Sequence, residues 1–128
     1  MPTSLPNELK YTKEHEWIRI EGDKASIGVT GFALEQLGDV VYIELPAIGS
    51  SLVAHKAFGT IESTKAVSEL FSPATGKVVE INNAIVDAPE SLVADAYHKG
   101  WLVKVEIAKQ PEELMTADEY EKYISGAQ

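Results

Sequence analysis

Short segments of alternating hydrophobic and polar residues make up most of the chain. Residues 16–20 alternate in this way, residues 21–24 supply turn-forming glycine and aspartate, and residues 25–29 alternate again, which predicts a β-hairpin. The same pattern predicts further strands over residues 39–45, 57–63, 66–71, 77–82 and 101–107. Short strands at a spacing of roughly 8 to 12 residues favour a sandwich or barrel over βαβ units.

Two segments have the spacing of short helices. Apolar residues recur at helical intervals within residues 30–37, and Gly38 can end that helix. Near the other end of the chain, Thr116 and Glu119 form a capping-box pattern ahead of an apolar stripe, which predicts a helix near residues 117–125. The pattern therefore predicts a mainly β fold with one short internal helix and one C-terminal helix.

The tetrapeptide Ser-Leu-Val-Ala occurs twice, at residues 51–54 and 91–94. Each copy follows a strand-like segment and a turn that carries a proline. An internal duplication would place two similar β units about a pseudo-twofold axis near Lys65. Because a four-residue match also arises by chance, both explanations stay open at this point.

Composition narrows the class of protein. A chain of 128 residues is short for two globular domains, so we expect one. Its 11 basic and 20 acidic residues give a net charge of −9, so neither nucleic acid nor a membrane is an expected partner. The chain has no cysteine and its three histidines are scattered, so no metal site is expected. The first residues lack a basic leader with an apolar core, which predicts a bacterial cytoplasmic protein, or a mitochondrial matrix protein if the chain is a processed eukaryotic form.

The most informative segment lies between two predicted strands. The chain has no glycine-rich phosphate loop, nucleophile elbow or HExxH motif, which disfavours an enzyme. Lys65, however, falls in a connection so short that only a tight hairpin fits, and a lysine at such a tip projects its ε-amine beyond the domain. A turn lysine ordinarily serves solubility. Here the neighbouring residues are small or acidic and would leave a modifying enzyme clear access: Glu62, Ser63, Thr64 and Ala66.

The segment Glu62-Ser-Thr-Lys-Ala66 resembles the lipoylation motif of the glycine cleavage system H protein family. Further segments match that family in order between residues 11 and 123: Tyr11-Thr-x-x-His-Glu-Trp17, Ile27-Gly-Val-Thr30, Leu37-Gly-Asp-Val-Val-Tyr-Ile-Glu-Leu-Pro46, Phe58-Gly, Ser72-Pro-x-x-Gly-x-Val78, Asn82, Asp87-Ala-Pro-Glu90 and Gly100-Trp-Leu102. The resemblance implies a barrel-sandwich hybrid of two antiparallel sheets, as in lipoyl and biotinyl carriers. It also implies a single domain over residues 11–128 behind an N-terminal extension of residues 1–10.

The resemblance implies a non-catalytic carrier. Lys65 would bear lipoate in amide linkage, which supplies the sulfur chemistry that a cysteine-free chain lacks. In the family, glycine decarboxylase, a pyridoxal-phosphate enzyme, loads the arm with the aminomethyl group of glycine. Aminomethyltransferase then passes the one-carbon unit to tetrahydrofolate, and dihydrolipoyl dehydrogenase, an FAD enzyme, reoxidises the dithiol. These three enzymes and the lipoyl-attaching enzymes are the implied partners, and we expect a monomer.

The resemblance also implies a polar groove that shields the loaded arm. It points to Glu16 in the His-Glu-Trp segment, with help from Gln36 and Glu69. Glu16 also has a simpler explanation as a charged residue at the start of a strand. Glu69 could serve partner recognition instead of shielding.

Other matching residues are better explained by the fold. Gly38, Gly49 and Gly76 are expected to meet the dihedral angles of turns. Trp17 and Trp101 are expected in the core or in a groove wall.

The chain departs from the family in one segment and leaves several alternatives open. Where relatives commonly have Asn-x-x-Pro-Tyr-Gly, residues 94–99 read Ala-Asp-Ala-Tyr-His-Lys, which could alter a turn near the groove. The first alternative is a lipoyl domain of a 2-oxoacid dehydrogenase complex. A biotinyl carrier is disfavoured because Thr64 and Ala66 stand where methionines flank the biotinylated lysine. An H-like lipoyl-relay protein and an unmodified interaction module also remain.

Overall fold

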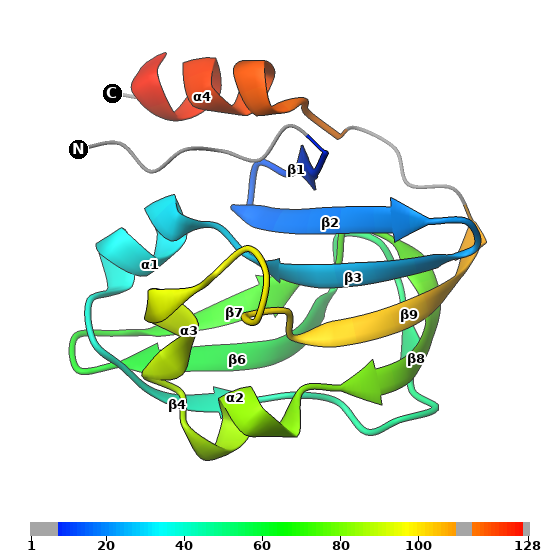
Figure 1. Ribbon diagram of the computed structural model, residues 1–128, viewed down its shortest axis with the longest axis horizontal. Coiled ribbons are helices and arrows are strands. Elements are labelled where there is room, and N and C mark those ends of the chain that lie inside the picture. Colours follow the sequence, from blue (N-terminus) through cyan, green and yellow to red (C-terminus); the bar gives the residue numbers. More distant parts are fainter. Residues whose placement is uncertain (1–7, 110–113, 127–128) are drawn as a thin grey trace.

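The computed structural model describes residues 8–109 and 114–126, and within them strands form two antiparallel sheets (Figure 1). The larger sheet has the strand order β1-β2-β3-β9-β8-β5, and the smaller sheet has the order β4-β6-β7. In the larger sheet the strands are β1 (Lys10–Tyr11), β2 (Glu16–Glu21), β3 (Lys24–Val29), β9 (Val103–Lys109), β8 (Thr75–Ile81) and β5 (Ser51–Leu52). In the smaller sheet they are β4 (Val40–Glu44), β6 (Ala57–Ser63) and β7 (Val67–Phe71).

The alternating pattern gives each sheet one buried face. On the smaller sheet, Ile43 and Ile61 lie opposite each other in register and are each 1% exposed. On the larger sheet, Ile27 pairs with Val103 and both are fully buried. Residues of both sheets belong to one hydrophobic cluster, so apolar burial holds the two layers together. The predicted mainly β fold of two antiparallel sheets is confirmed.

Four helices connect or cover the sheets in the described part of the chain: α1 (Gly31–Leu37), α2 (Asn83–Asp87), α3 (Ser91–Ala94) and α4 (Ala117–Gly126). The predicted internal helix is α1, which begins after Thr30, whose side chain accepts a hydrogen bond from the backbone N–H of Ala33. The predicted C-terminal helix is α4. Its capping box is formed reciprocally, since Thr116 N donates to Glu119 Oε1 at 2.9 Å and Glu119 N donates to Thr116 Oγ1 at 3.2 Å.

The C-terminal helix packs beside the first strand. Figure 1 shows α4 lying along the β1 side of the larger sheet. The rings of Tyr11 and Tyr120 stack there with centroids 5.0 Å apart, and Tyr11 N donates to Met115 O at 2.8 Å. Leu9 lies in the predicted N-terminal extension but is fully buried in the core. The predicted boundary between residues 10 and 11 falls inside β1, and residues 1–7 of the extension lie outside the described residues.

The two identical tetrapeptides adopt different structures. Ser51–Leu52 forms β5 and pairs with β8, whereas Ser91–Ala94 forms α3. The second copy follows a turn in which Ser91 N donates to Ala88 O and Leu92 N donates to Pro89 O. Tertiary context therefore decides the conformation of this short sequence, and the match does not mark a repeated unit at this segment.

Candidate functional site

Lys65 lies at the tip of the hairpin between β6 and β7. Strand pairing runs up to Glu62 and Val67, and Ser63 N closes the tip by donating to Ala66 O at 2.8 Å. The Ser63 hydroxyl oxygen then accepts hydrogen bonds from Lys65 N at 3.1 Å and Ala66 N at 3.0 Å. A serine that binds the next backbone amides is a common way to stabilise a tight turn. The backbone beneath Lys65 is thus fixed by local bonds.

The tip is also attached to the connection between α1 and β4. Thr64 N donates to Asp39 O at 3.0 Å. Gly38, the residue before Asp39, has φ +84°, and a Cβ there would lie 3.2 Å from Lys65 Cε and 3.8 Å from Nζ. The lysine side chain therefore passes closely over Gly38, a position that suits glycine both in conformation and in space. Figure 1 shows the β6–β7 loop at one edge of the molecule beside this connection.

The ammonium group of Lys65 is accessible. The residue is exposed, and the structure gives its side chain no hydrogen bond or ion pair with any described residue. Attachment of an acyl group at Nζ would therefore break no interaction and would bury no charge. Lys65 lies at a hairpin tip, as predicted, and its flanking residues Thr64 and Ala66 are exposed too, so an acyl group on Nζ would have room around it.

Glu16 lies inside the protein. Its side chain is 2% exposed, Thr12 Oγ1 donates to Oε1 at 3.0 Å, and Phe71 N donates to Oε2 at 3.2 Å. Burial raises the pKa of the Glu16 carboxyl from 4.5 to about 8, although the hydrogen bonds from Phe71 and Thr12 act in the opposite direction. This carboxyl joins the start of β2 to the end of β7.

The three residues predicted for the shielding groove occupy different places. Glu16 contacts Phe71, and about 13 Å of strand separates that residue from Val67 near the tip, at roughly 3.3 Å per residue. Gln36 is exposed on α1, and Glu69 is exposed on β7. Among the described residues, no hydrogen bond or ion pair joins these three to one another or to Lys65. The groove stays a prediction.

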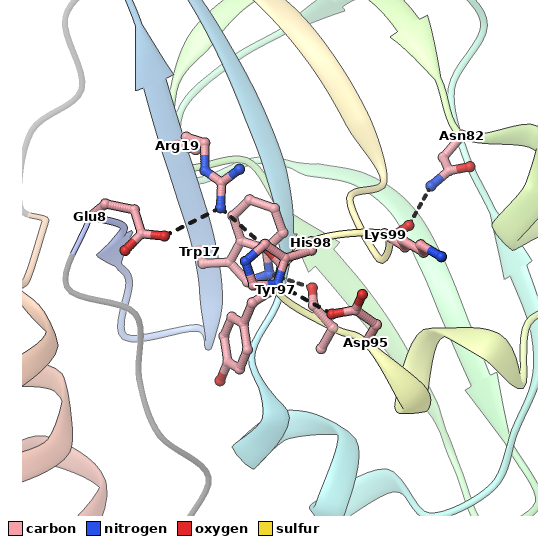
Figure 2. A network of polar contacts seen from close by, with 9 residues as sticks. Glu8, Trp17, Arg19, Asn82, Asp95, Tyr97, His98 and Lys99 are labelled. Atoms are coloured by element: carbon pink, nitrogen blue, oxygen red, sulfur yellow. Dashed lines mark hydrogen bonds and ion pairs between the residues drawn. The ribbon is translucent and has the colours of Figure 1, made fainter.

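The segment that departs from the family is firmly attached to the rest of the protein. Two side chains of β2 bind its backbone: Trp17 Nε1 donates to Ala96 O at 3.0 Å, and Arg19 Nη2 donates to Tyr97 O at 3.3 Å. Figure 2 shows Trp17 and Arg19 pointing from β2 toward Tyr97. The Tyr97 hydroxyl accepts from Gly31 N at 2.7 Å and so holds the first turn of α1.

Sequence analysis did not identify Tyr97, because its partner lies 66 residues away and no local pattern marks the contact. Asn82 anchors the other end of the segment, since its Nδ2 donates to Lys99 O at 2.9 Å and to Trp101 O at 2.7 Å. The Tyr97 bond therefore ties this segment to the start of α1, and the Asn82 bonds tie its end to the start of α2.

The described residues contain neither a cluster of metal ligands nor a membrane-spanning helix. No three side chains of histidine, cysteine, aspartate or glutamate within 8–109 and 114–126 gather in a way that could hold a metal ion. No helix in the same ranges is long and apolar enough to cross a membrane.

The fold consists of two antiparallel sheets, and an exposed lysine lies at the tip of a hairpin closed by hydrogen bonds. This arrangement is typical of a carrier domain. The family model described as glycine cleavage H-protein matches residues 9–127. The glycine cleavage system H protein of Halalkalibacterium halodurans is 52% identical over 125 residues, which cover 96% of this chain and 98% of that protein. The H protein of Herpetosiphon aurantiacus is 50% identical over 123 residues, which cover 96% of this chain and 95% of that protein.

A solved structure agrees with these sequence matches. The crystal structure of a glycine cleavage system H protein from Mycobacterium marinum is 40% identical, has a TM-score of 0.88, and covers 97% of this chain and 100% of its own. The chain belongs to the glycine cleavage H-protein family. The resemblance seen in the sequence is confirmed, and the role of lipoyl carrier in the glycine cleavage system follows from the family.

Proposed function

We propose that Lys65 is the residue acylated by lipoate, and that the chain carries the aminomethyl group of glycine between glycine decarboxylase, aminomethyltransferase and dihydrolipoyl dehydrogenase without catalysing a step itself. The observation that carries this proposal is the exposed Lys65 ammonium, unpaired among the described residues, at a hairpin tip fixed by its own backbone bonds. When bound, lipoate supplies a dithiol that the cysteine-free chain cannot provide.

Attachment would use an activated lipoyl group as acyl donor. The transfer forms an amide bond between the acyl carbon and Lys65 Nζ and breaks the bond from that carbon to its activating group, which leaves with the bonding electron pair. The Nζ ammonium releases two protons, one before the attack and one as the amide forms. The amide removes the positive charge of the lysine. Lysine and lipoyl chain together span on the order of 10–15 Å, judged from standard bond lengths. The arm can therefore enter a partner's active site while Ser63 keeps its base fixed.

Intact mass after co-expression with a lipoyl ligase tests the attachment site. The parent chain should gain the mass of one lipoyl group, and both Lys65→Ala and Lys65→Arg should gain none. Lys56→Ala is the matched control, because Lys56 is also an exposed lysine next to β6 and should leave the adduct in place. An adduct that persists in Lys65→Arg would refute the site.

Reconstitution separates glycine cleavage from lipoyl relay. The lipoylated chain should support exchange of carbon between glycine and bicarbonate in the presence of glycine decarboxylase. Complete lipoylation without any exchange would favour an H-like relay protein that supplies lipoate to other enzymes.

We propose that Glu16, Gln36 and Glu69 shield the arm. Gln36 is supported by its place on α1, two residues before the glycine that Lys65 contacts, and Glu69 by its exposure on β7. Glu16 would have to exchange its hydrogen bonds to Thr12 and Phe71 to reach the arm. The Glu16→Gln chain should lose a glycine-derived carbon label faster than the parent, and an unchanged rate would remove Glu16 from the groove.

The remaining expectations concern the setting of the protein. The relatives named above are proteins of bacteria, which supports action in a bacterial cytoplasm. The expected monomer is checked by analytical ultracentrifugation of the full chain. The other components of the system remain the proposed partners, and pull-down with each separate enzyme would test them one at a time.

A further inference from the structure

The outer face of the smaller sheet has an ordered pattern of apolar and acidic residues. Strand register aligns Tyr42 with Glu62 and Glu62 with Val67 across the three strands. Residues directly opposite in antiparallel strands point to the same side of a sheet. Since the next residue along β4, Ile43, faces the core, this row faces outward. A second outward row lies two residues further from the tip and consists of Glu44, Thr60 and Glu69. We call these six residues the hairpin face.

The apolar residues of the hairpin face are unusually exposed. Val67 is 66% exposed and Tyr42 is 48% exposed. Val41, the extra residue of a β-bulge in the edge strand β4, is 53% exposed beside them. Exposed apolar side chains gathered on one part of a surface mark interaction sites more often than single ones do. The row of Tyr42, Glu62 and Val67, which holds two of them, begins two residues from Lys65.

The charges on the hairpin face all have one sign. Three of its six residues are glutamates (Glu44, Glu62 and Glu69), and none is lysine or arginine. In the outward rows, Glu62 separates the two apolar side chains and the other two glutamates flank Thr60. A complementary partner would present apolar side chains among lysine and arginine residues, because opposite potentials attract and steer the encounter.

The short distance between the hairpin face and Lys65 indicates which enzyme covers this face. Val67 lies two residues from Lys65, about 7 Å along an extended chain. A lysine side chain reaches only about 6 Å from its Cα, judged from standard bond lengths. An enzyme that bonds an acyl carbon to Nζ must therefore cover the hairpin tip and the row beside it. Enzymes that use the finished arm can stay further away, because lysine and lipoyl chain together span roughly 10–15 Å.

We propose that the hairpin face is the docking surface for the enzyme that acylates Lys65, which meets it with an apolar patch surrounded by basic residues. The proposal rests on the proposed function, because it assumes that Lys65 is acylated. In this proposal the enzyme recognises the attachment motif and also a surface whose main apolar contacts are Tyr42 and Val67.

The first experiment removes the apolar surface with little change in strand propensity. In the full-length apo chain, the double variant Tyr42→Thr/Val67→Thr is compared with the parent as a substrate of a lipoate-protein ligase. We expect kcat/KM for acylation to fall at least about fivefold, mostly through KM, as for a buried interface residue. Calorimetric titration of the apo chain into the ligase should show Kd raised by a similar factor.

A matched control uses exposed apolar residues away from the face. Ile48 and Val53 are 62% and 51% exposed and lie outside the β4-β6-β7 sheet. The Ile48→Thr/Val53→Thr chain should be acylated at the parent rate. Thermal unfolding of both double variants checks that they fold.

The second experiment removes charge and does not depend on the first variant folding. Glu44→Gln/Glu69→Gln should lower the association rate with the ligase and flatten its dependence on salt concentration. Glu21→Gln is the control, since Glu21 is an exposed carboxylate on β2 of the other sheet. Its association rate should match the parent at every salt concentration.

Four outcomes would overturn the proposal. Acylation of Tyr42→Thr/Val67→Thr at the parent kcat/KM, or an equal loss in the control pair, would show that the face is not read by the ligase. Normal acylation with impaired glycine–bicarbonate exchange would assign the face to glycine decarboxylase instead. A parent chain that is never acylated at Lys65 would refute the proposed function, and this inference with it.

Discussion

Two regions of the molecule treat charged and polar groups in opposite ways. At the hairpin tip, Lys65 keeps an exposed ammonium without a side-chain partner among the described residues, and only backbone groups and Ser63 hold the turn. In the corner between β2, β7 and α4, the Glu16 carboxyl is buried and both its oxygens accept hydrogen bonds. At the tip the fold needs no contact from the Lys65 side chain, whereas in the corner it relies on polar groups that are buried.

In the corner around α4, the buried and half-buried polar side chains are hydrogen-bonded to one another. The Tyr120 hydroxyl shares hydrogen bonds of 2.8 Å with His15 Nδ1 and of 2.8 Å with Thr30 Oγ1. Burial lowers the pKa of His15, so its imidazole is neutral near pH 7. Thr30 also caps α1, whose far end contacts Lys65 through Gly38. Buried networks of this kind are costly when one member is removed.

The strongest test of the buried corner is the pH dependence of stability. Glu16 has a pKa of about 8 in the folded protein, against 4.5 ordinarily. A raised pKa means that the folded state holds the proton more tightly, so this stabilisation is present below pH 4.5 and is lost as pH rises through about 8. At about 1.4 kcal/mol per pKa unit, the loss amounts to a few kcal/mol. Glu16→Gln should abolish it and should be more stable than the parent at pH 9.

Urea unfolding at a series of pH values measures this difference. Glu14→Gln serves as the control, because Glu14 is exposed two residues earlier in the same segment. Its unfolding free energy should follow the parent curve. Parallel curves for the parent and Glu16→Gln would show that Glu16 does not titrate near pH 8.

The next largest effect is expected at the tyrosine of α4. Tyr120→Phe removes the hydroxyl and leaves His15 and Thr30 without that partner in a buried site, which should cost about 1–3 kcal/mol of unfolding free energy. Tyr123→Phe is the matched control, since the Tyr123 hydroxyl makes only a long, exposed bond of 3.5 Å to Lys13 O. Thermal unfolding should separate the two variants, and equal losses would contradict the role of the network.

The fold could be predicted from local patterns where those patterns decide the structure. The strand over residues 57–63 has the bounds that alternation predicts, and the capping box of Thr116 and Glu119 marks the start of α4. The short helices α2 and α3 were not predicted, because five and four residues are too few to show a helical spacing of apolar positions, and α3 has no side-chain cap. Asn82 caps α2 while its amide donates to backbone carbonyls at Lys99 and Trp101.

Gly76 shows that local sequence also fails to reveal long-range contacts within a strand. It was predicted to occupy a turn, but it lies in β8, where a Cβ would stand 2.3 Å from Glu106 O. Glycine is needed there because β9 approaches closely, and no neighbouring residue in the sequence reveals that approach. The prediction of a turn at Gly76 was wrong for this reason.

The predicted site residues show the same difference between local and long-range contacts. Lys65 and its turn could be found from a local motif, because the hydrogen bonds of the Ser63 side chain stay within three residues. The environment of Glu16 could not, since Phe71, which donates to its carboxylate, is 55 residues away. Local chemistry is visible in a sequence, whereas burial and long-range partners depend on the completed fold.

An effect of similar size is expected where the two regions meet, at the glycine under Lys65. Gly38→Ala should cost about 1–3 kcal/mol, because alanine is strained at φ +84°. It should also displace the lysine side chain, since its Cβ would lie 3.2 Å from Lys65 Cε. Gly22→Ala is the control: Gly22 has φ +68° and open space around it. Only Gly38→Ala should change the acylation rate of Lys65, and an equal rate in both variants would show that the close approach has no role.

The smallest effect concerns the turn itself. Ser63→Ala removes the hydroxyl that accepts from Lys65 N and Ala66 N, and the loss should be about 0.5–1.5 kcal/mol because water can replace an exposed partner. Amide hydrogen exchange at Ala66 should accelerate, while exchange at buried Leu70 should not change. Ser68→Ala, at an exposed serine of β7, should alter neither. If Ala66 exchanges at the parent rate in Ser63→Ala, strand pairing alone fixes the tip, and the contrast with the buried corner rests on Lys65 only.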